Sequence, residues 1–298
     1  MRFPLRDVPL LLGVLSLSMG CAEVLGFDDS RELEPKGGGG GAGANTGASG
    51  GGGTDQPGGS GEGGGGGVID PYVQAVLEDE PILYLRLEDE RSPLKNEITG
   101  GQDATCSGGL VYGQPARVGN GLEFPGVGTE VVVEDDANEL DFLDTSTFTI
   151  ELWAWANEND RFQHLVAKRV QVGSNEHYGF SLSIEGDSHM LSFTRADHAD
   201  TDDPIRNAKW PMETGRFIHI VATFDGTTQR LYIDGEPAPA PDGVVVGSGV
   251  TLPDLEEPLR IGSGDGFGYF NGTLDEIAIY KEALSGTRIR AHYEAASP

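Results

Sequence analysis

The stretch FIHIVATFDGTTQRLYIDGEPA, residues 217–238, carries the strongest local structural signal in the chain. Two runs rich in apolar and β-branched residues flank Asp225-Gly226, a pair that favours a tight turn between antiparallel strands. The stretch therefore predicts a β-hairpin, and it sets the pattern by which the rest of the chain can be interpreted.

Short strand patterns, separated by Gly, Asp and Pro, extend on both sides of this hairpin. They cover residues 82–89, 121–126, 130–134, 148–156, 164–170, 178–186, 189–196, 258–264 and 272–280. Residues 283–296 predict the only helix, with Ser285 as its N-cap. Many short strands with few helices predict an all-β fold, a two-sheet antiparallel sandwich or jelly roll.

The N-terminal part of the chain has a different composition. Residues 36–67 consist mostly of glycine, and such a segment buries too little apolar surface to fold. The predicted organisation is a signal peptide at 1–20, a disordered Gly-rich tether at 21–67, and one folded domain at 68–298.

The first twenty residues have the features of a secretion signal. Arg2 and Arg6 precede the apolar run 8–17, which is too short to span a bilayer as a stable helix. Gly20-Cys21 resembles the end of a bacterial lipobox, which implies lipidation of Cys21 and anchoring by acyl chains alone. By the same resemblance, Ala22 favours the outer membrane or the cell surface. The alternative is an ordinary signal peptide cut near the same place.

The charge of the chain limits its partners. The formal net charge is −28 at pH 7. A surface this acidic repels nucleic acid phosphates and anionic lipid head groups, so we expect neither as a partner. It is compatible with cation binding, and it also keeps an exposed protein soluble.

The order of motifs in the folded part resembles a known family. ILYLRLED (82–89), STFTIELWAWA (146–156), the 217–238 hairpin, and G-x-L-D-E-x-x-x-Y-x-x-A-L-S from Gly272 resemble LamG-like domains of the concanavalin A-like lectin and glucanase superfamily. The resemblance implies a jelly-roll sandwich, mostly used as a binding module for glycans or proteins. With the anchor and the tether, the chain resembles a myxobacterial surface lipoprotein.

One segment of the chain is similar to the catalytic motif of the glucanases in this superfamily. Glucanases of this superfamily carry Glu-x-Asp-x-x-Glu on one strand, so that the carboxylates flank the sugar. The nearest match, Glu139-Leu140-Asp141 followed by Asp144, ends in Asp and is interpreted as a surface turn. The chain is therefore predicted not to be an enzyme, with a glycoside hydrolase as the alternative. Trp153 and Trp155 share one strand face, where they either stack on a sugar or pack in the core.

Calcium is the predicted cofactor, by resemblance to LamG-like and pentraxin-like domains. Asn175 and Glu176 match a pentraxin ligand pair, and Asp265 and Asn271 lie near the position of a second ligand cluster. These residues supply the carboxylate and carbonyl oxygens that calcium prefers. An alternative calcium site uses Glu88 and Asp275 on the first and last strands. The interpretation without calcium is that these acids are solvated loop residues.

Residues 196–210 form a long polar segment unlike a strand, and long loops on rigid sandwiches often carry binding function. The predicted ligand-binding residues are Asp197, Asp202, Asp203, Arg206 and Trp210. Three hypotheses remain open: a surface-anchored module that binds a glycan or a protein, a glycoside hydrolase, and a structural component of the envelope.

Overall fold

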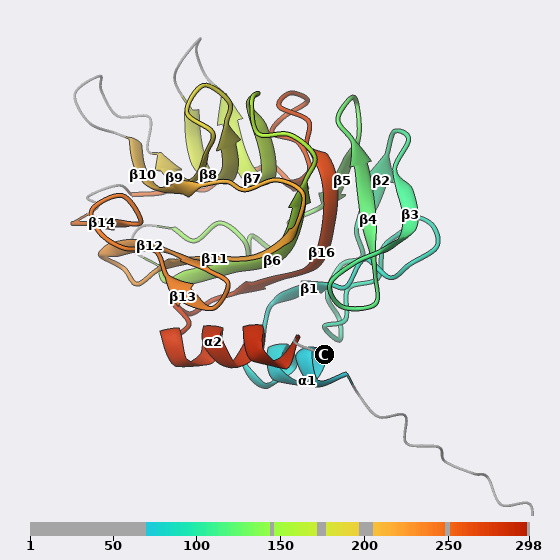
Figure 1. Cartoon of the computed structure of the whole chain (residues 1–298), viewed down its shortest axis with the longest axis horizontal. Helices are drawn as coiled ribbons and strands as arrows, with labels where there is room; N and C mark the ends of the chain where they lie inside the picture. The colour runs from blue at the N-terminus through green and yellow to red at the C-terminus, as the bar shows by residue number, and fades with distance from the viewer. Residues whose placement is uncertain (1–69, 144–145, 172–176, 197–204, 248–250, 297–298) are drawn as a thin grey trace, which may run out of the picture. The chain divides into compact units, whose positions relative to one another are not determined.

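The computed structural model describes residues 70–143, 146–171, 177–196, 205–247 and 251–296. Two antiparallel sheets face each other, and Figure 1 shows β7–β10 in the upper layer and β6, β11 and β16 in the lower layer. This arrangement confirms the predicted two-sheet sandwich. The predicted signal peptide, Cys21 and the Gly-rich tether lie outside the described residues.

One sheet has nine strands, ordered β13-β12-β11-β6-β16-β4-β3, with β1 paired to β16 and β14 paired to β12. Its strands are β1 (Leu83–Leu85), β3 (Val111–Pro115), β4 (Asn120–Pro125), β6 (Phe148–Ala156), β11 (Phe217–Phe224), β12 (Thr228–Ile233), β13 (Glu236–Pro237), β14 (Val244–Val246) and β16 (Asn271–Tyr280). Strands β11 and β12 form the hairpin predicted around Asp225-Gly226, which is thereby confirmed.

The other sheet has seven strands, ordered β10-β9-β8-β7-β15-β5-β2. Its strands are β2 (Thr105–Ser107), β5 (Glu130–Val133), β7 (Gln163–Gln171), β8 (His177–Glu185), β9 (Met190–Ala196), β10 (Ile205–Pro211) and β15 (Leu259–Ile261). All of its neighbouring strands run antiparallel.

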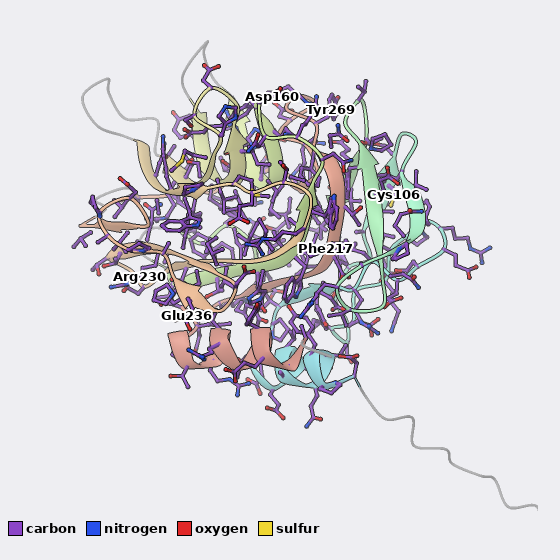
Figure 2. The ribbon with its side chains drawn as sticks, viewed as in Figure 1. Cys106, Asp160, Phe217, Arg230, Glu236 and Tyr269 are labelled. Atoms are coloured by element: carbon purple, nitrogen blue, oxygen red, sulfur yellow. The ribbon has the colours of Figure 1, made fainter. Side chains whose placement is uncertain are left out.

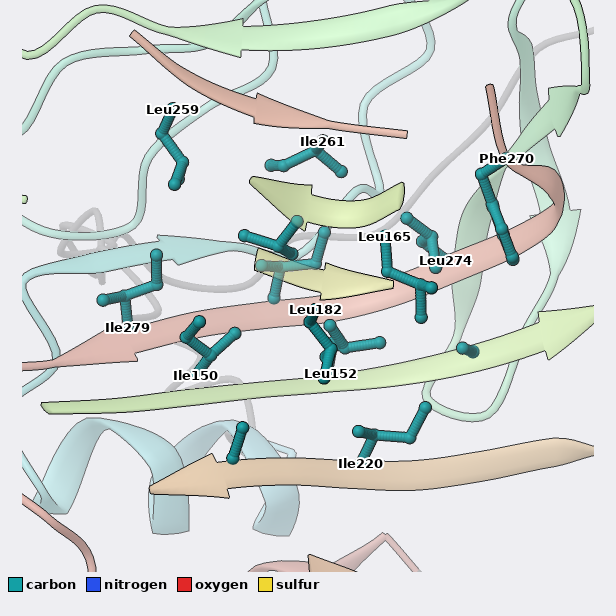
Figure 3. Close-up of a cluster of buried hydrophobic side chains, with 14 of the residues drawn as sticks. Ile150, Leu152, Leu165, Leu182, Ile220, Leu259, Ile261, Phe270, Leu274 and Ile279 are labelled. Atoms are coloured by element: carbon teal, nitrogen blue, oxygen red, sulfur yellow. The ribbon is translucent and has the colours of Figure 1, made fainter. Parts of the chain in front are cut away.

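The main core lies between the two sheets. Strand β6 shows how it forms, because Phe148, Ile150 and Leu152 alternate along the strand and all three are buried in this core. Figure 3 shows a part of it, in which side chains of the nine-stranded sheet meet those of the seven-stranded sheet; the labelled residues are Ile150, Leu152, Leu165, Leu182, Ile220, Leu259, Ile261, Phe270, Leu274 and Ile279.

Two helices pack beside the nine-stranded sheet, as Figure 1 shows. Helix α2 (Gly286–Ala295) begins after Ser285, whose side chain accepts a hydrogen bond from the Arg288 amide, so the predicted N-cap is confirmed. The prediction of a single helix is wrong: α1 (Pro71–Glu78) begins after Asp70, which caps it in the same way. No helix among the described residues is long and apolar enough to cross a membrane.

Two predicted boundaries also differ from the structure. Strand β1 ends at Leu85, and Leu87 has a φ of 62°, so the backbone turns out of the sheet before residue 89. The segment 196–210 is not all loop, because Ile205–Pro211 pairs with β9 as an edge strand. Its polar residues favoured a loop, and pairing with the preceding strand β9 overrode that local preference.

Candidate functional site

The outer face of the seven-stranded sheet, turned away from the core, carries a set of polar side chains. We call this the polar face and define it by residues His164, Arg169, Ser181, Ser183, Ser192, Thr194, Asn207 and Lys209. The strand register sets these residues side by side. Ser183 pairs with both His164 and Ser192, and Ser192 pairs in turn with Lys209. A second row begins at Ser181 and continues through Thr194 to Asn207.

The alternation of β8 explains this surface. Phe180, Leu182 and Ile184 are buried in the main core, so Ser181 and Ser183 between them point to the opposite side of the sheet. Both serines are nevertheless almost inaccessible to solvent. The hydroxyl groups of the polar face are thus held by regular strands and largely shielded from solvent.

The loop 264–268 folds onto one end of the polar face. The ring of Phe267 lies with its centroid 5.3 Å from that of His164, and it stacks on Phe162 from the 157–162 loop at 6.1 Å. The Arg169 guanidinium lies 5.2 Å from the Phe267 centroid, in a cation–π contact. Figure 2 shows Asp160 and Tyr269, from the same two loops, at this end of the sandwich.

Charged groups border the face on its other sides. At the β10 edge, Lys209 Nζ lies 2.8 Å from Glu185 Oε2. Beyond β7, Arg260 lies 3.1 Å from Glu130, which also accepts a hydrogen bond from Ser263. Hydroxyls, an amide and paired charges together form a surface suited to polar ligands.

Two polar atoms of the face have no hydrogen-bond partner among the described residues. They are Arg169 Nε and Asn207 Oδ1, and both atoms are buried. Burial lowers the pKa of Arg169, against the opposing effect of the Asp265 charge. Buried polar atoms are normally hydrogen-bonded, so two orphaned atoms on one face indicate places where a ligand can bond.

The outer face of the nine-stranded sheet is closed by comparison. Trp153 is buried there and forms ring contacts with Tyr72 of α1 and Tyr293 of α2. Of the two interpretations of the tryptophan pair, core packing therefore holds for Trp153. Next to it, Glu151 is fully buried and contacts His219, His292 and two tyrosine hydroxyls.

A bulge in β16 adds a second buried acidic pair on this side. Leu274 and Ile277 both pack in the main core, while Asp275 and Glu276 between them turn outward where the register shifts. Asp275 accepts a hydrogen bond from the Val118 amide. Glu276 bonds to the Tyr84 hydroxyl and lies 3.1 Å from Arg86. Burial raises the pKa of Glu276 from 4.5 to about 7, although Tyr84 and Arg86 favour its ionised form.

A pH dependence of stability follows for Glu276. The pKa of Glu276 is higher in the folded than in the unfolded chain, so the protonated carboxyl favours the folded state. This stabilisation is complete below pH 4.5 and is lost as the pH rises to about 7. As the pH rises from 4.5 to 8, the unfolding free energy of the parent chain should fall by roughly 3 kcal/mol more than that of the Glu276→Gln variant. Urea unfolding of both proteins across this range measures the difference. Equal losses in the two proteins would assign the pH dependence to other groups.

Only Asp265 and Asn271 of the predicted rim calcium site are described. Asp265 is exposed, and its charge acts on Arg169. The side chain of Asn271 is engaged at both ends, with Asn157 and Glu158. Asn175 and Glu176 lie outside the described residues. Within the described ranges, no group of three or more His, Cys, Asp or Glu side chains is placed to hold a metal ion.

The alternative calcium residues, Glu88 and Asp275, both accept hydrogen bonds from residues 118–120. Glu88 accepts from the backbone and side-chain amides of Asn120 and also contacts Arg86. Asp275 accepts from the Val118 amide through one of its oxygens. These bonds connect both carboxylates to residues 118–120, and Asp275 Oδ1 has no hydrogen-bond partner among the described residues.

The predicted ligand loop is only partly described. Asp197, Asp202 and Asp203 lie outside the described residues, and of Arg206 only the backbone position in β10 is described. Trp210 packs against the main core rather than on the polar face. Its strand neighbours Asn207 and Lys209 belong to the polar face instead.

The interpretation of residues 139–144 as a surface turn is wrong for its central residues. Leu140, Asp141 and Phe142 are buried. Asp141 Oδ1 lies 2.9 Å from Lys168 Nζ, whereas Glu139 pairs with Lys281 at the surface. Glu139 and Asp141 thus have separate partners and do not lie on a strand, and Asp144 lies outside the described residues.

The polar face itself was missed at the level of sequence, although a signal existed. In 178–186 and 189–196, serine or threonine occupies every second position between apolar residues, as Ser181, Ser183, Ser192 and Thr194. On an outer strand face such residues are common, so the pattern alone does not distinguish a site from an ordinary solvated surface.

The fold is a two-sheet antiparallel β sandwich. The chain belongs to the Laminin_G_3 family, the concanavalin A-like lectin/glucanases superfamily, whose model matches residues 125–290. No match was found among curated proteins.

Solved structures with a similar fold differ widely in sequence. Domain 4 of AbnA, a GH43 extracellular arabinanase from Geobacillus stearothermophilus in complex with arabinotriose, has a TM-score of 0.56 and 14% identity over 73% of this chain and 98% of that domain. The binding domain of botulinum neurotoxin DC in complex with rat synaptotagmin II has a TM-score of 0.57 and 13% identity over 74% of this chain and 52% of that domain. The chain therefore spans about half of the neurotoxin domain, and the likeness shows the fold alone.

Proposed function

We propose that this domain is a non-catalytic binding module that recognises a glycan through the polar face of its seven-stranded sheet. The observation that carries the proposal is the pair of serine- and threonine-containing rows across β7–β10, where Asn207 Oδ1 in one row and Arg169 Nε beside the rows are buried without a partner among the described residues. Sugar hydroxyls can supply the hydrogen bonds that these atoms lack.

The chemistry of the face favours a glycan over a protein ligand. Protein-binding surfaces usually centre on exposed aromatic or aliphatic anchors, whereas this face presents hydroxyls, an amide and charged groups. Phe267 and Phe162 stand at one end, where an aromatic edge can support a sugar ring. Among proteins of similar fold, the arabinanase domain was solved with arabinotriose, which is consistent with this choice.

The double substitution Ser192→Ala with Thr194→Val tests the proposal. The two hydroxyls lie 3.4 Å apart, within hydrogen-bond distance of each other. Replacing both therefore removes this bond without leaving one of its partners unpaired inside the protein. We expect affinity for the glycan to fall roughly tenfold, since each lost hydrogen bond to a ligand contributes about 0.5–1.5 kcal/mol. A glycan array on the full chain identifies the ligand, and calorimetry measures the change.

A matched control lies in the same sheet. Thr105 and Ser107 are exposed on the edge strand β2 and have the same spacing, so Thr105→Val with Ser107→Ala removes the same two groups elsewhere. Affinity should stay within twofold of the parent chain. Equal losses in both double variants, or no glycan bound on a broad array, would overturn the proposal. Calorimetry repeated with calcium and with a chelator tests the proposed calcium dependence.

We also propose that the chain is held at the cell surface by acyl groups on Cys21. The support is the lipobox-like Gly20-Cys21 followed by the glycine-rich segment 36–67. Mass spectrometry of the N-terminal peptide from the mature protein is expected to show an acylated cysteine. An unmodified N-terminus released into the medium would show an ordinary signal peptide instead.

A further inference from the structure

Arg169 differs from the other cations that line the polar face. Lys209 is paired with Glu185, and Arg260 is paired with Glu130. Arg169 has no carboxylate within ion-pair distance among the described residues, and only the more distant charge of Asp265 acts on it. It is also 8% exposed, so its guanidinium is largely removed from water. A buried, uncompensated cation is costly, which makes its place on this face significant.

The position of Arg169 is set by its surroundings. Its guanidinium lies against the ring of Phe267, and its cross-strand partner Gly179 has no side chain. Its neighbour on the same face, Ala167, is small and leaves the long side chain room to lie along the sheet. Arg169 is thus held in one place by packing, with Nε left without a hydrogen-bond partner. A guanidinium fixed in this way is prepared to receive a planar anion through two hydrogen bonds.

We propose that Arg169 makes the polar face selective for a glycan that carries a carboxylate, such as a saccharide with a uronic acid residue. This inference rests on the proposed function, because it concerns the same face. The carboxylate would pair with Arg169, and the hydroxyls of the same sugar would bond to the serine and threonine rows that begin at Ser181 and Ser183.

The net charge of the chain sets a limit on this ligand. At −28, the protein repels polyanions at long range, and salt screens this repulsion beyond about 8–10 Å. The contact with Arg169 is short and buried, so salt weakens it much less. The expected ligand therefore carries isolated acidic residues in an otherwise neutral chain, and its affinity should not fall steeply with added salt.

The test compares matched pairs of oligosaccharides on the full chain, one member containing glucose and the other glucuronic acid at the same position. We expect the parent chain to bind the acidic member about tenfold to a hundredfold more tightly, as a charge-assisted pair predicts. The Arg169→Gln variant should bind both members with equal affinity, close to that of the parent for the neutral one. Arg169→Lys keeps the charge without the fork and should retain part of the preference.

The possible results separate this inference from the proposed function. If the parent chain binds both members equally, or if Arg169→Gln leaves the preference unchanged, the face binds glycans but Arg169 does not select for acid. If neither member nor any glycan on the array binds, both proposals are overturned. Thermal melting of each variant shows whether it is folded; should Arg169→Gln unfold, the comparison of Arg169→Lys with the parent chain decides.

Discussion

The variant Lys168→Met is expected to lose about 3–5 kcal/mol of unfolding free energy, because it leaves two buried carboxylates without their counter-ion. Lys168 Nζ lies 3.0 Å from Asp135 and 2.9 Å from Asp141, and all three side chains are almost completely buried. The ammonium also donates hydrogen bonds to the carbonyls of Leu255 and Glu257. A single substitution thus disturbs the contacts that hold the loops with Asp135, Asp141, Leu255 and Glu257 against β7.

Urea unfolding of Lys168→Met and of Lys281→Met measures this effect against a matched control. Lys281 pairs with Glu139 at an exposed position, where an ion pair contributes about 0–1 kcal/mol. Adding Asp141→Asn to Lys168→Met should recover part of the lost stability, since it removes one of the unpaired charges. A loss under 1 kcal/mol for Lys168→Met would mean that the carboxylates find other partners or take up protons at little cost.

The second large effect concerns Glu151, which joins both helices to the nine-stranded sheet. Its carboxylate accepts hydrogen bonds from Tyr72 of α1 at 3.0 Å and from Tyr280 of β16 at 2.8 Å. It also lies 2.9 Å from His219 Nε2 and 3.0 Å from His292 Nδ1. Burial raises the pKa of Glu151, but the two histidines lower it more, so the pKa lies well below its usual range.

We expect Glu151→Ala to destabilise the domain by about 4 kcal/mol or more, because four buried partners lose their common acceptor and a cavity remains. Hydrogen exchange should show α1 and α2 opening first, since Tyr72 and His292 anchor them to the sheet through this carboxylate. Glu123→Ala, at a half-buried position of β4, is the control and should cost less than 1 kcal/mol. A similar loss in the two variants would show that the carboxylate is not the common anchor.

These two clusters engage two of the buried acids of the domain. Asp141 belongs to the ion cluster with Lys168, and Glu151 is fully buried among its four partners. Neither lies on the polar face. The acids that border the face, Glu185 and Glu130, are each paired with a cation.

Much of the fold could be predicted because its signals are local. Alternation along 148–156 marks which residues enter the core, and Asp225-Gly226 marks a hairpin turn. Ser285 caps a helix through its own amide neighbours. The failures arise where tertiary pairing overrides the local signal: β10 becomes a strand because it pairs with the preceding strand β9, and Asp141 is buried because Lys168 meets it.

The sequence by itself determined a two-sheet sandwich, its main hairpin, its C-terminal helix and its family, since alternation, turn residues and caps act over a few neighbouring positions. Only the tertiary structure decided which polar residues form a surface together. The polar face depends on the register between four strands and on the loop that brings Phe267 to Arg169. A shift of one residue in that register would turn the same serines into the core, which is why no local pattern could reveal the face.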